Sequence, residues 1–221
     1  MLHSQSSAVS AKNVTVTNHR EVIKYFIMLV TIWTLYLLFL YDYISSIHLG
    51  YVLTSLCKVS LFLLPILWIT KLNGLRSVGI SYPNSNTFKI GFLVASIYLV
   101  VGTMLNIYVG GCSVMKLPDL RFWLFNFIIS CLVEEIVFRG FIFQRLRSVS
   151  SFRLSAIISS ILFLIIHFPG WIIFSMESWI VVSISIFILG IVLAYVKERT
   201  ESVWACYIIH AFNNLAAHCT S

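Results

Sequence analysis

Long apolar runs are the feature that most limits how this chain can fold. Four or more of them exceed roughly 18 residues, the length at which an apolar stretch is typical of a helix that spans a membrane. The chain has 221 residues, of which 59% are hydrophobic and only 10% are charged. Soluble domains are far more polar than this. The sequence therefore predicts an all-α fold, a polytopic membrane protein built as a helical bundle.

The apolar runs divide the chain into helices and short connections. We expect about seven transmembrane helices, with approximate limits 22–43, 51–70, 88–109, 120–146, 152–168, 178–196 and 203–217. Residues 1–20 are mostly polar and are expected to form a flexible cytoplasmic N-terminus. Residues 21–110 would hold three helices and residues 111–221 a four-helix half, with both parts in one structural domain.

The basic residues indicate how the chain crosses the membrane. If the N-terminus is cytoplasmic, eleven lysines and arginines fall in inner segments, against three in outer segments, Lys58, Lys116 and Arg121. This bias follows the positive-inside rule and predicts an extracytoplasmic C-terminus. We therefore attribute the net charge of +7 to the orientation of the chain in a lipid bilayer, and we expect no nucleic-acid partner. A small chain with few extramembrane loops is typical of a multi-pass protein in a bacterial plasma membrane, and we expect that location.

The five cysteines form no Cys-x-x-Cys pair, which argues against a disulfide framework or a thiolate zinc site. We interpret them as small apolar packing residues. Cys131 is the one that could act otherwise, because it lies three residues before Glu134 and shares its helix face.

Two adjacent carboxylates and an arginine interrupt the fourth predicted helix. Ionisable groups at bilayer depth are costly and by default indicate function. Glu135 and Arg139 are four residues apart, so they lie on one helix face and can form a structural ion pair. Glu134 is turned away by about 100°. It is therefore the carboxylate that Arg139 leaves available for chemistry.

Three further polar residues are predicted to reach the depth of Glu134. At about 1.5 Å per residue, Glu134 and His210 each lie about 16 Å above the inner surface, and His167 about 21 Å. Asn214 follows His210 on the same helix face, one turn further on. Each residue alone could be an interhelical hydrogen-bond partner or a packing group. The four together, drawn from three helices, favour a functional site.

The same residues resemble the motifs of a known family. The motif residues are Glu134-Glu135-x-x-x-Arg139, Phe163-x-x-x-His167 and His210-x-x-x-Asn214. In order and placement they resemble the CAAX-protease and bacteriocin-processing family, intramembrane endopeptidases related to the type II prenyl-protein protease. The resemblance covers about residues 121–219, which makes residues 111–221 the catalytic half.

The resemblance implies helices around a conical intramembrane cavity and assigns roles to four residues. Glu134 and His167 would activate water, while His210 and Asn214 would stabilise the oxyanion. Hydrolysis needs such a base and such donors. A divalent metal held by Glu134, His167 and His210 is the alternative, since two His and one Glu fit zinc. Asparagine is a poor zinc ligand and no His-Glu-x-x-His is present, so no metal and no other cofactor is favoured.

The expected activity is hydrolysis of a peptide bond in a membrane-associated peptide or lipidated protein. The sequence does not name that substrate or indicate an oligomeric state. Two rival functions stay open: a bacteriocin-immunity or peptide-binding membrane protein that does not cleave, and a proton-coupled transporter.

Overall fold

The computed structural model describes residues 2–69, 80, 83–110, 117–176 and 179–219, which form helices and no strands. The helices of the first half are α1 (Leu2–Phe39), α2 (Tyr41–Ser46), α3 (Gly50–Ile69) and α4 (Ser85–Gly110). Those of the second half are η2 (Phe122–Ser130), α5 (Cys131–Glu135), η3 (Ile136–Phe143), α6 (Gln144–Arg147), α7 (Phe152–Ile165), α8 (Phe168–Ile173), α9 (Trp179–Thr200) and α10 (Val203–Cys219). The predicted all-α membrane bundle is confirmed.

Each predicted span corresponds to a helix or to a continuous helical stretch of the structure. Among the described residues, five segments are long and apolar enough to cross a membrane: 19–39, 50–69, 85–105, 152–173 and 179–200. The other two predicted spans are the stretch from η2 to α6, which carries the charged motif, and α10, which has only 17 residues. A multi-pass membrane protein follows, and the number seven stays a prediction.

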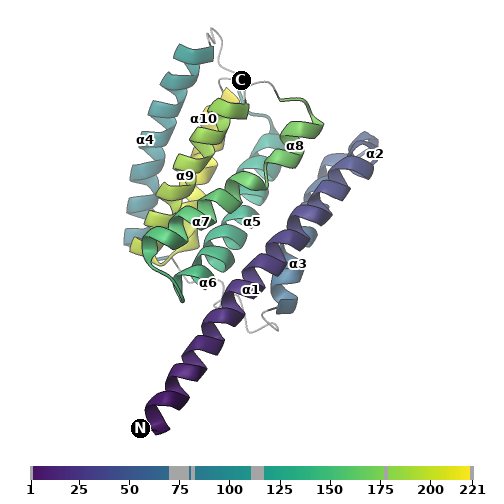
Figure 1. Ribbon diagram of the computed structural model, residues 1–221. Coiled ribbons are helices and arrows are strands. Elements are labelled where there is room, and N and C mark those ends of the chain that lie inside the picture. The colour runs from purple at the N-terminus through teal and green to yellow at the C-terminus, as the bar shows by residue number, and fades with distance from the viewer. Residues whose placement is uncertain (1, 70–79, 81–82, 111–116, 177–178, 220–221) are drawn as a thin grey trace.

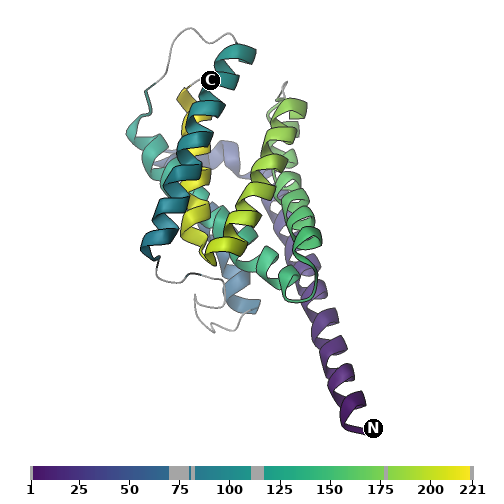
Figure 2. The same cartoon turned by 90° about the vertical axis from the view of Figure 1, so that its left-hand side faces the viewer.

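The first helix is longer than its predicted span. Helix α1 begins at Leu2, so residues that we expected to be flexible are helical in this structure. The amino-terminal part of α1 projects beyond the bundle in two perpendicular views (Figures 1 and 2). Helix α10 ends at the opposite end of the bundle, near the mark for the C-terminus (Figure 1).

The fourth span is a wide helix. Two π-helical segments, η2 and η3, flank α5. The short helix α5 has only five residues and carries Glu134 and Glu135. All eight residues of η3 are buried, which places this segment in the middle of the bundle. Such i→i+5 segments are rare and occur often at functional sites.

The other helices pack around this central stretch in two groups. Helix α4 lies along α10, and α7 lies along α9 (Figure 1). Helix α1 contacts α3 and α8, and α3 also contacts η2 and α5. The central stretch therefore has α3 and α1 on one side and α7, α9 and α10 on the other.

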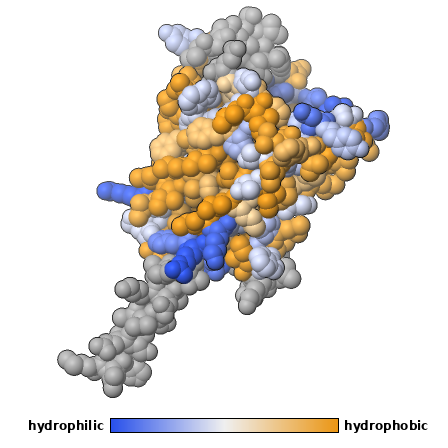
Figure 3. Space-filling model, turned by 45° about the vertical axis from the view of Figure 1, so that its right-hand side comes forward, coloured by the Kyte–Doolittle hydropathy of each residue, from blue (hydrophilic) through white to orange (hydrophobic). Residues whose placement is uncertain are grey.

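The outer surface is suited to lipid. Large side chains such as Leu93, Ile184 and Trp68 are exposed on the outward faces of the long helices. Figure 3 shows large continuous hydrophobic areas over the described part of the bundle. In water such areas would promote association, whereas in a bilayer they contact acyl chains.

One basic residue does not lie where the charge count placed it. We counted Lys58 among the outer segments, but it lies in the middle of α3, between Gly50 and Ile69. The reason is an ion pair at that depth, described below. Lys116 lies outside the described residues, as does Cys112.

Candidate active site

The most buried polar group of the site is an ion pair within one helix. Arg139 Nη1 lies 3.0 Å from Glu135 Oε1, and the two side chains are 1% and 0% exposed. The guanidinium also lies over the ring of Phe163, 4.3 Å from its centroid, and Arg139 Nη2 donates to Gly190 O at 3.4 Å. The structure thus has the ion pair that the spacing of four residues predicted. The pair ties the central stretch to α7 and α9.

His210 connects this buried pair to the second glutamate. Its Nδ1 lies 2.8 Å from Glu135 Oε1, the same oxygen that accepts from Arg139. A carboxylate paired with an arginine is an acceptor, so Nδ1 carries a proton and donates. The other ring nitrogen, Nε2, lies 3.8 Å from Glu134 Oε2. His210 is therefore held by Glu135 and presents Nε2 to Glu134.

Glu134 has a partner that the sequence analysis missed. Lys58 Nζ lies 2.5 Å from Glu134 Oε1 and 2.5 Å from Ser130 Oγ, and Ser130 Oγ donates to Glu134 Oε1 at 3.2 Å. Glu134 is thus not the unpaired carboxylate that we expected. The sequence did contain a signal for Lys58, because a charged residue inside an apolar span indicates function, and we applied this rule to Glu134 but not to Lys58.

His167 lies at the turn between α7 and α8, where it is partly exposed. Its Nδ1 lies 2.7 Å from Phe163 O, and because a carbonyl only accepts, Nδ1 donates. Neutral His167 therefore has a free lone pair on Nε2. The ring of Phe163 also packs edge-on against the rings of His167 and His210. Phe163 therefore orients His167 through its carbonyl oxygen and supports His210 through its ring.

The predicted site residue Asn214 contacts the central stretch at Cys131, three residues before Glu134. Its Nδ2 lies 3.1 Å from the Sγ of Cys131, one residue after Ser130 on the central stretch. Cys131 itself is fully buried and contacts Asn126 O at 3.1 Å. A thiol is a weak acceptor, so this hydrogen bond holds the amide of Asn214 only weakly in its present orientation.

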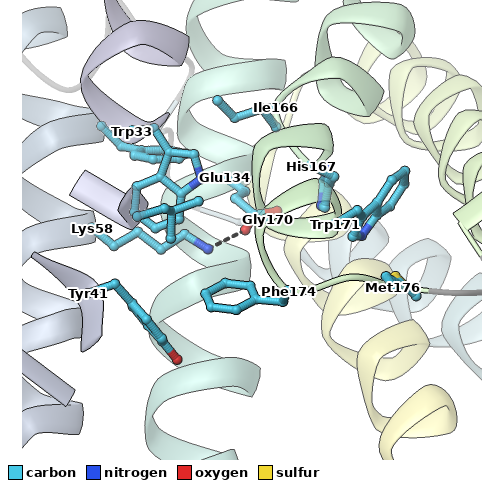
Figure 4. A pocket seen from close by; sticks show the side chains of 12 residues that line it. Trp33, Tyr41, Lys58, Glu134, Ile166, His167, Gly170, Trp171, Phe174 and Met176 are labelled. Carbon is cyan, nitrogen blue, oxygen red and sulfur yellow. Dashed lines mark hydrogen bonds and ion pairs between the residues drawn. The ribbon is translucent and has the colours of Figure 1, made fainter. Parts of the chain in front are cut away.

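A cavity of about 520 Å³ gives access to Glu134 and His167. Its walls are largely aromatic and apolar. The lining residues are Trp33, Leu37, Tyr41, Lys58, Phe62, Glu134, Ile166, His167, Gly170, Trp171, Phe174 and Met176. Figure 4 shows Lys58 and Glu134 pointing toward each other, with His167 and Trp171 together on the facing wall. A pocket of this size and lining is typical of a small-molecule or peptide site.

Glu134, His167 and His210 are the three groups that the sequence analysis considered as metal ligands. Within the described part of the chain, no group of three His, Cys, Asp or Glu side chains could hold a metal ion. The ammonium of Lys58 also lies against Glu134 Oε1, which places a cation where the carboxylate would bind one.

One comparison with known proteins matches a large part of the second half of the chain. Residues 116–216 match the family model described as type II CAAX prenyl endopeptidase Rce1-like. No curated protein and no solved structure matches the chain significantly. The matched residues include all three motifs, whereas Lys58 and the cavity residues of α1 and α3 lie outside them. The family resemblance seen in the sequence is confirmed, and at the family level it indicates a CAAX-type membrane protease.

Proposed function

We propose that this chain, whose residues 116–216 belong to the type II CAAX prenyl endopeptidase Rce1-like family, is an intramembrane endopeptidase. It would hydrolyse a peptide bond of a membrane-associated peptide or a lipidated protein. The observation that carries the proposal is a shared cavity: Glu134 and His167, from separate helices of an apolar bundle, line the same space.

Glu134 and His167 activate the attacking water. Lys58 and Ser130 contact Oε1 of Glu134, so Oε2 is the oxygen free to accept a proton from water. The lone pair on His167 Nε2 accepts the other hydrogen of that water and orients it. The water oxygen bonds to the peptide carbonyl carbon as its proton passes to Glu134. The C–N bond then breaks, and the leaving nitrogen takes the proton back from Glu134.

His210 and Asn214 stabilise the oxyanion of the tetrahedral intermediate. Because Nδ1 of His210 is held by Glu135, its Nε2 donates to the oxyanion once the ring has taken up a second proton from water, before the peptide binds. The amide of Asn214 leaves the weak acceptor Cys131 Sγ and turns to the oxyanion. Removing one donor of this kind typically lowers the rate by about 10²–10³.

We further propose that no metal takes part. The support is the charge arrangement at Glu134, where the Lys58 ammonium already neutralises the carboxylate and repels a second cation. The aromatic and apolar lining of the cavity suits an apolar peptide side chain or a lipid chain on the substrate. We place the protein in a bacterial plasma membrane because a small chain with few extramembrane loops suits one, and we place its N-terminus in the cytoplasm on the charge bias of the sequence.

The test is direct cleavage of a defined peptide by the purified full chain in nanodiscs. The probe is an internally quenched peptide that ends in Cys-a-a-X with a farnesylated cysteine, and the same peptide without the lipid is its match. We expect products from at least one peptide, identified by mass spectrometry, and none from the Glu134→Gln variant. Binding of both peptides without turnover would favour a peptide-binding or immunity protein. Proton flux into liposomes that requires Glu134 would favour a transporter.

A further inference from the structure

Lys58 reaches the candidate site from the half of the chain that the family model does not match. It lies in the middle of α3, and its ammonium contacts Glu134 Oε1 and Ser130 Oγ, each at 2.5 Å. A lysine at this depth in an apolar helix is costly unless its charge is paired. The pair with Glu134 therefore accounts for its being tolerated, and leaves open what it does for the site.

The side chain of Lys58 is held on several sides. Besides Glu134 and Ser130, its ammonium lies 5.9 Å from the ring centroid of Trp33 and 5.6 Å from that of Phe62. Both are within the range of a cation–π interaction. A lysine is ordinarily a flexible point charge. Here the two rings, from α1 and α3, and the two oxygen atoms of the central stretch surround the ammonium of Lys58.

The consequence for Glu134 is that its two oxygens differ. Oε1 accepts from Lys58 and Ser130, while Oε2 lies 3.8 Å from His210 Nε2. A general base must be held within hydrogen-bond reach of the proton that it removes. Without Lys58, Ser130 alone would donate to Oε1, through the longer hydrogen bond of 3.2 Å, and the carboxylate could rotate more easily. With Lys58, one oxygen is left for water in one direction.

This ion pair differs from the structural pair in the same helix. Glu135 and Arg139 are 0% and 1% exposed, whereas Glu134 and Lys58 are 10% and 19% exposed and line the cavity. A pair that only stabilises the fold gains nothing from facing the cavity. Among the described residues that line it, Lys58 is the one lysine or arginine.

We propose that Lys58 is a positioning residue of the active site, which holds Glu134 Oε1 so that Oε2 is the oxygen that takes a proton from water. The inference rests on the proposed function. It also means that residues 116–216 do not make a complete site, because α3 supplies the group that orients the base.

The contact itself is tested without substrate, by zero-length cross-linking in the purified full chain. A hydrophobic carbodiimide activates the Glu134 carboxyl, and attack by the Lys58 amine forms an amide with loss of one water, which the reagent takes up as its urea. Peptide mapping should find a Lys58–Glu134 cross-link in the wild type and none to Glu135. A Lys58 that cross-links elsewhere, or not at all, would overturn the proposal.

The role is tested by kinetics with whichever of the two quenched peptides the wild type cleaves. We expect Lys58→Met to lower kcat by roughly ten- to hundred-fold, since small displacements of a catalytic group have effects of this size. KM should change less than about twofold, because ground-state binding is untouched. Lys58→Arg should restore most of kcat. If Lys58→Met does not accumulate in membranes, Lys58→Gln replaces it. Its side chain is one atom shorter and uncharged, so it holds Glu134 Oε1 less well and should also lower kcat.

The matched control is Lys197→Met. Lys197 is buried, and its Nζ donates to Glu201 O at 2.7 Å at the end of α9, away from the cavity. Its loss should lower the melting temperature and leave kcat unchanged. Loss of kcat in step with melting temperature for both lysines would show that Lys58 is merely structural. A raised KM with normal kcat would make it a substrate ligand instead.

Failure of this inference can be separated from failure of the proposed function. If Glu134→Gln is inactive and Lys58→Met is fully active, only the role of Lys58 is wrong. If the wild type cleaves neither the farnesylated nor the unlipidated peptide, or if Glu134→Gln cleaves normally, the proposed function is wrong. The positioning role is then overturned with it, whatever the cross-link shows.

Discussion

Two adjacent glutamates have different surroundings, and the difference sets what each can do. Glu135 is fully buried between Arg139 and His210, so its charge stabilises the fold. Glu134 faces a cavity and shares its charge with a lysine from another helix. Because successive helical residues point about 100° apart, Glu135 lies in the packed interior while Glu134 lies where a substrate can reach it.

Glutamine substitutions should separate these two roles. Glu135→Gln removes the charge that Arg139 needs inside an apolar setting, and breaking a buried pair costs about 3–5 kcal/mol. We expect a clear drop in melting temperature and in the amount of folded protein in the membrane. Glu134→Gln should fold nearly normally, because Lys58 borders the cavity and can be hydrated there, but should lose activity. Equal loss of folded protein in both variants would contradict this division.

At the scale of the helices, close packing holds the buried arginine in place. A Cβ built on Gly190 of α9 would lie 2.8 Å from the Cβ of Ser160 in α7, closer than real contacts. The same glycine offers its carbonyl to Arg139. The absence of a side chain therefore lets α9 approach both α7 and the central ion pair.

Gly190→Ala should push these helices apart. We expect destabilisation of about 1–3 kcal/mol, the usual cost of overpacking a core, despite the better helix propensity of alanine. Thermal unfolding in detergent would measure it. Gly102→Ala in α4 is the matched control, because its Cβ would meet Ala216 Cβ at an ordinary 3.4 Å. Ser160→Gly should restore part of the stability of Gly190→Ala, and equal stability of the two alanine variants would argue against this packing.

Much of this arrangement could be predicted from the sequence because apolar length and helical spacing are local properties. The spans and the Glu135–Arg139 pair follow from them. The widening into π-helix at η2 and η3 could not be predicted, because it depends on packing around the central stretch. The contact between Lys58 and Glu134 joins residues 76 positions apart, and no spacing rule reports such a contact. The same holds for the amide of Asn214, which contacts Cys131 in this structure.

For the molecule as a whole, the first half of the chain completes the cavity of the second. Trp33 and Leu37 come from α1, and Lys58 and Phe62 from α3, all outside residues 116–216. We therefore expect substrate selection to depend on these two helices as well as on the motifs.

The membrane orientation can be tested with reporter fusions. A reporter fused after Ser221 should be extracytoplasmic, and one inserted between residues 77 and 86 should be cytoplasmic, because basic residues concentrate on that side. Alkaline phosphatase and fluorescent protein activities in intact cells measure the two sides. Reporters that score on the same side would show that the number of spans is wrong.

The most direct test of the whole account is the activity of the purified chain after exhaustive treatment with a strong zinc chelator. If Glu134 and His167 activate water without a metal, cleavage of the quenched peptide should continue at the untreated rate. His210→Ala and Asn214→Ala should then each lower kcat more than they change KM, because oxyanion donors act in the transition state. Activity that is lost on chelation and returns with one equivalent of zinc or cobalt would contradict the account, and would make these residues metal ligands.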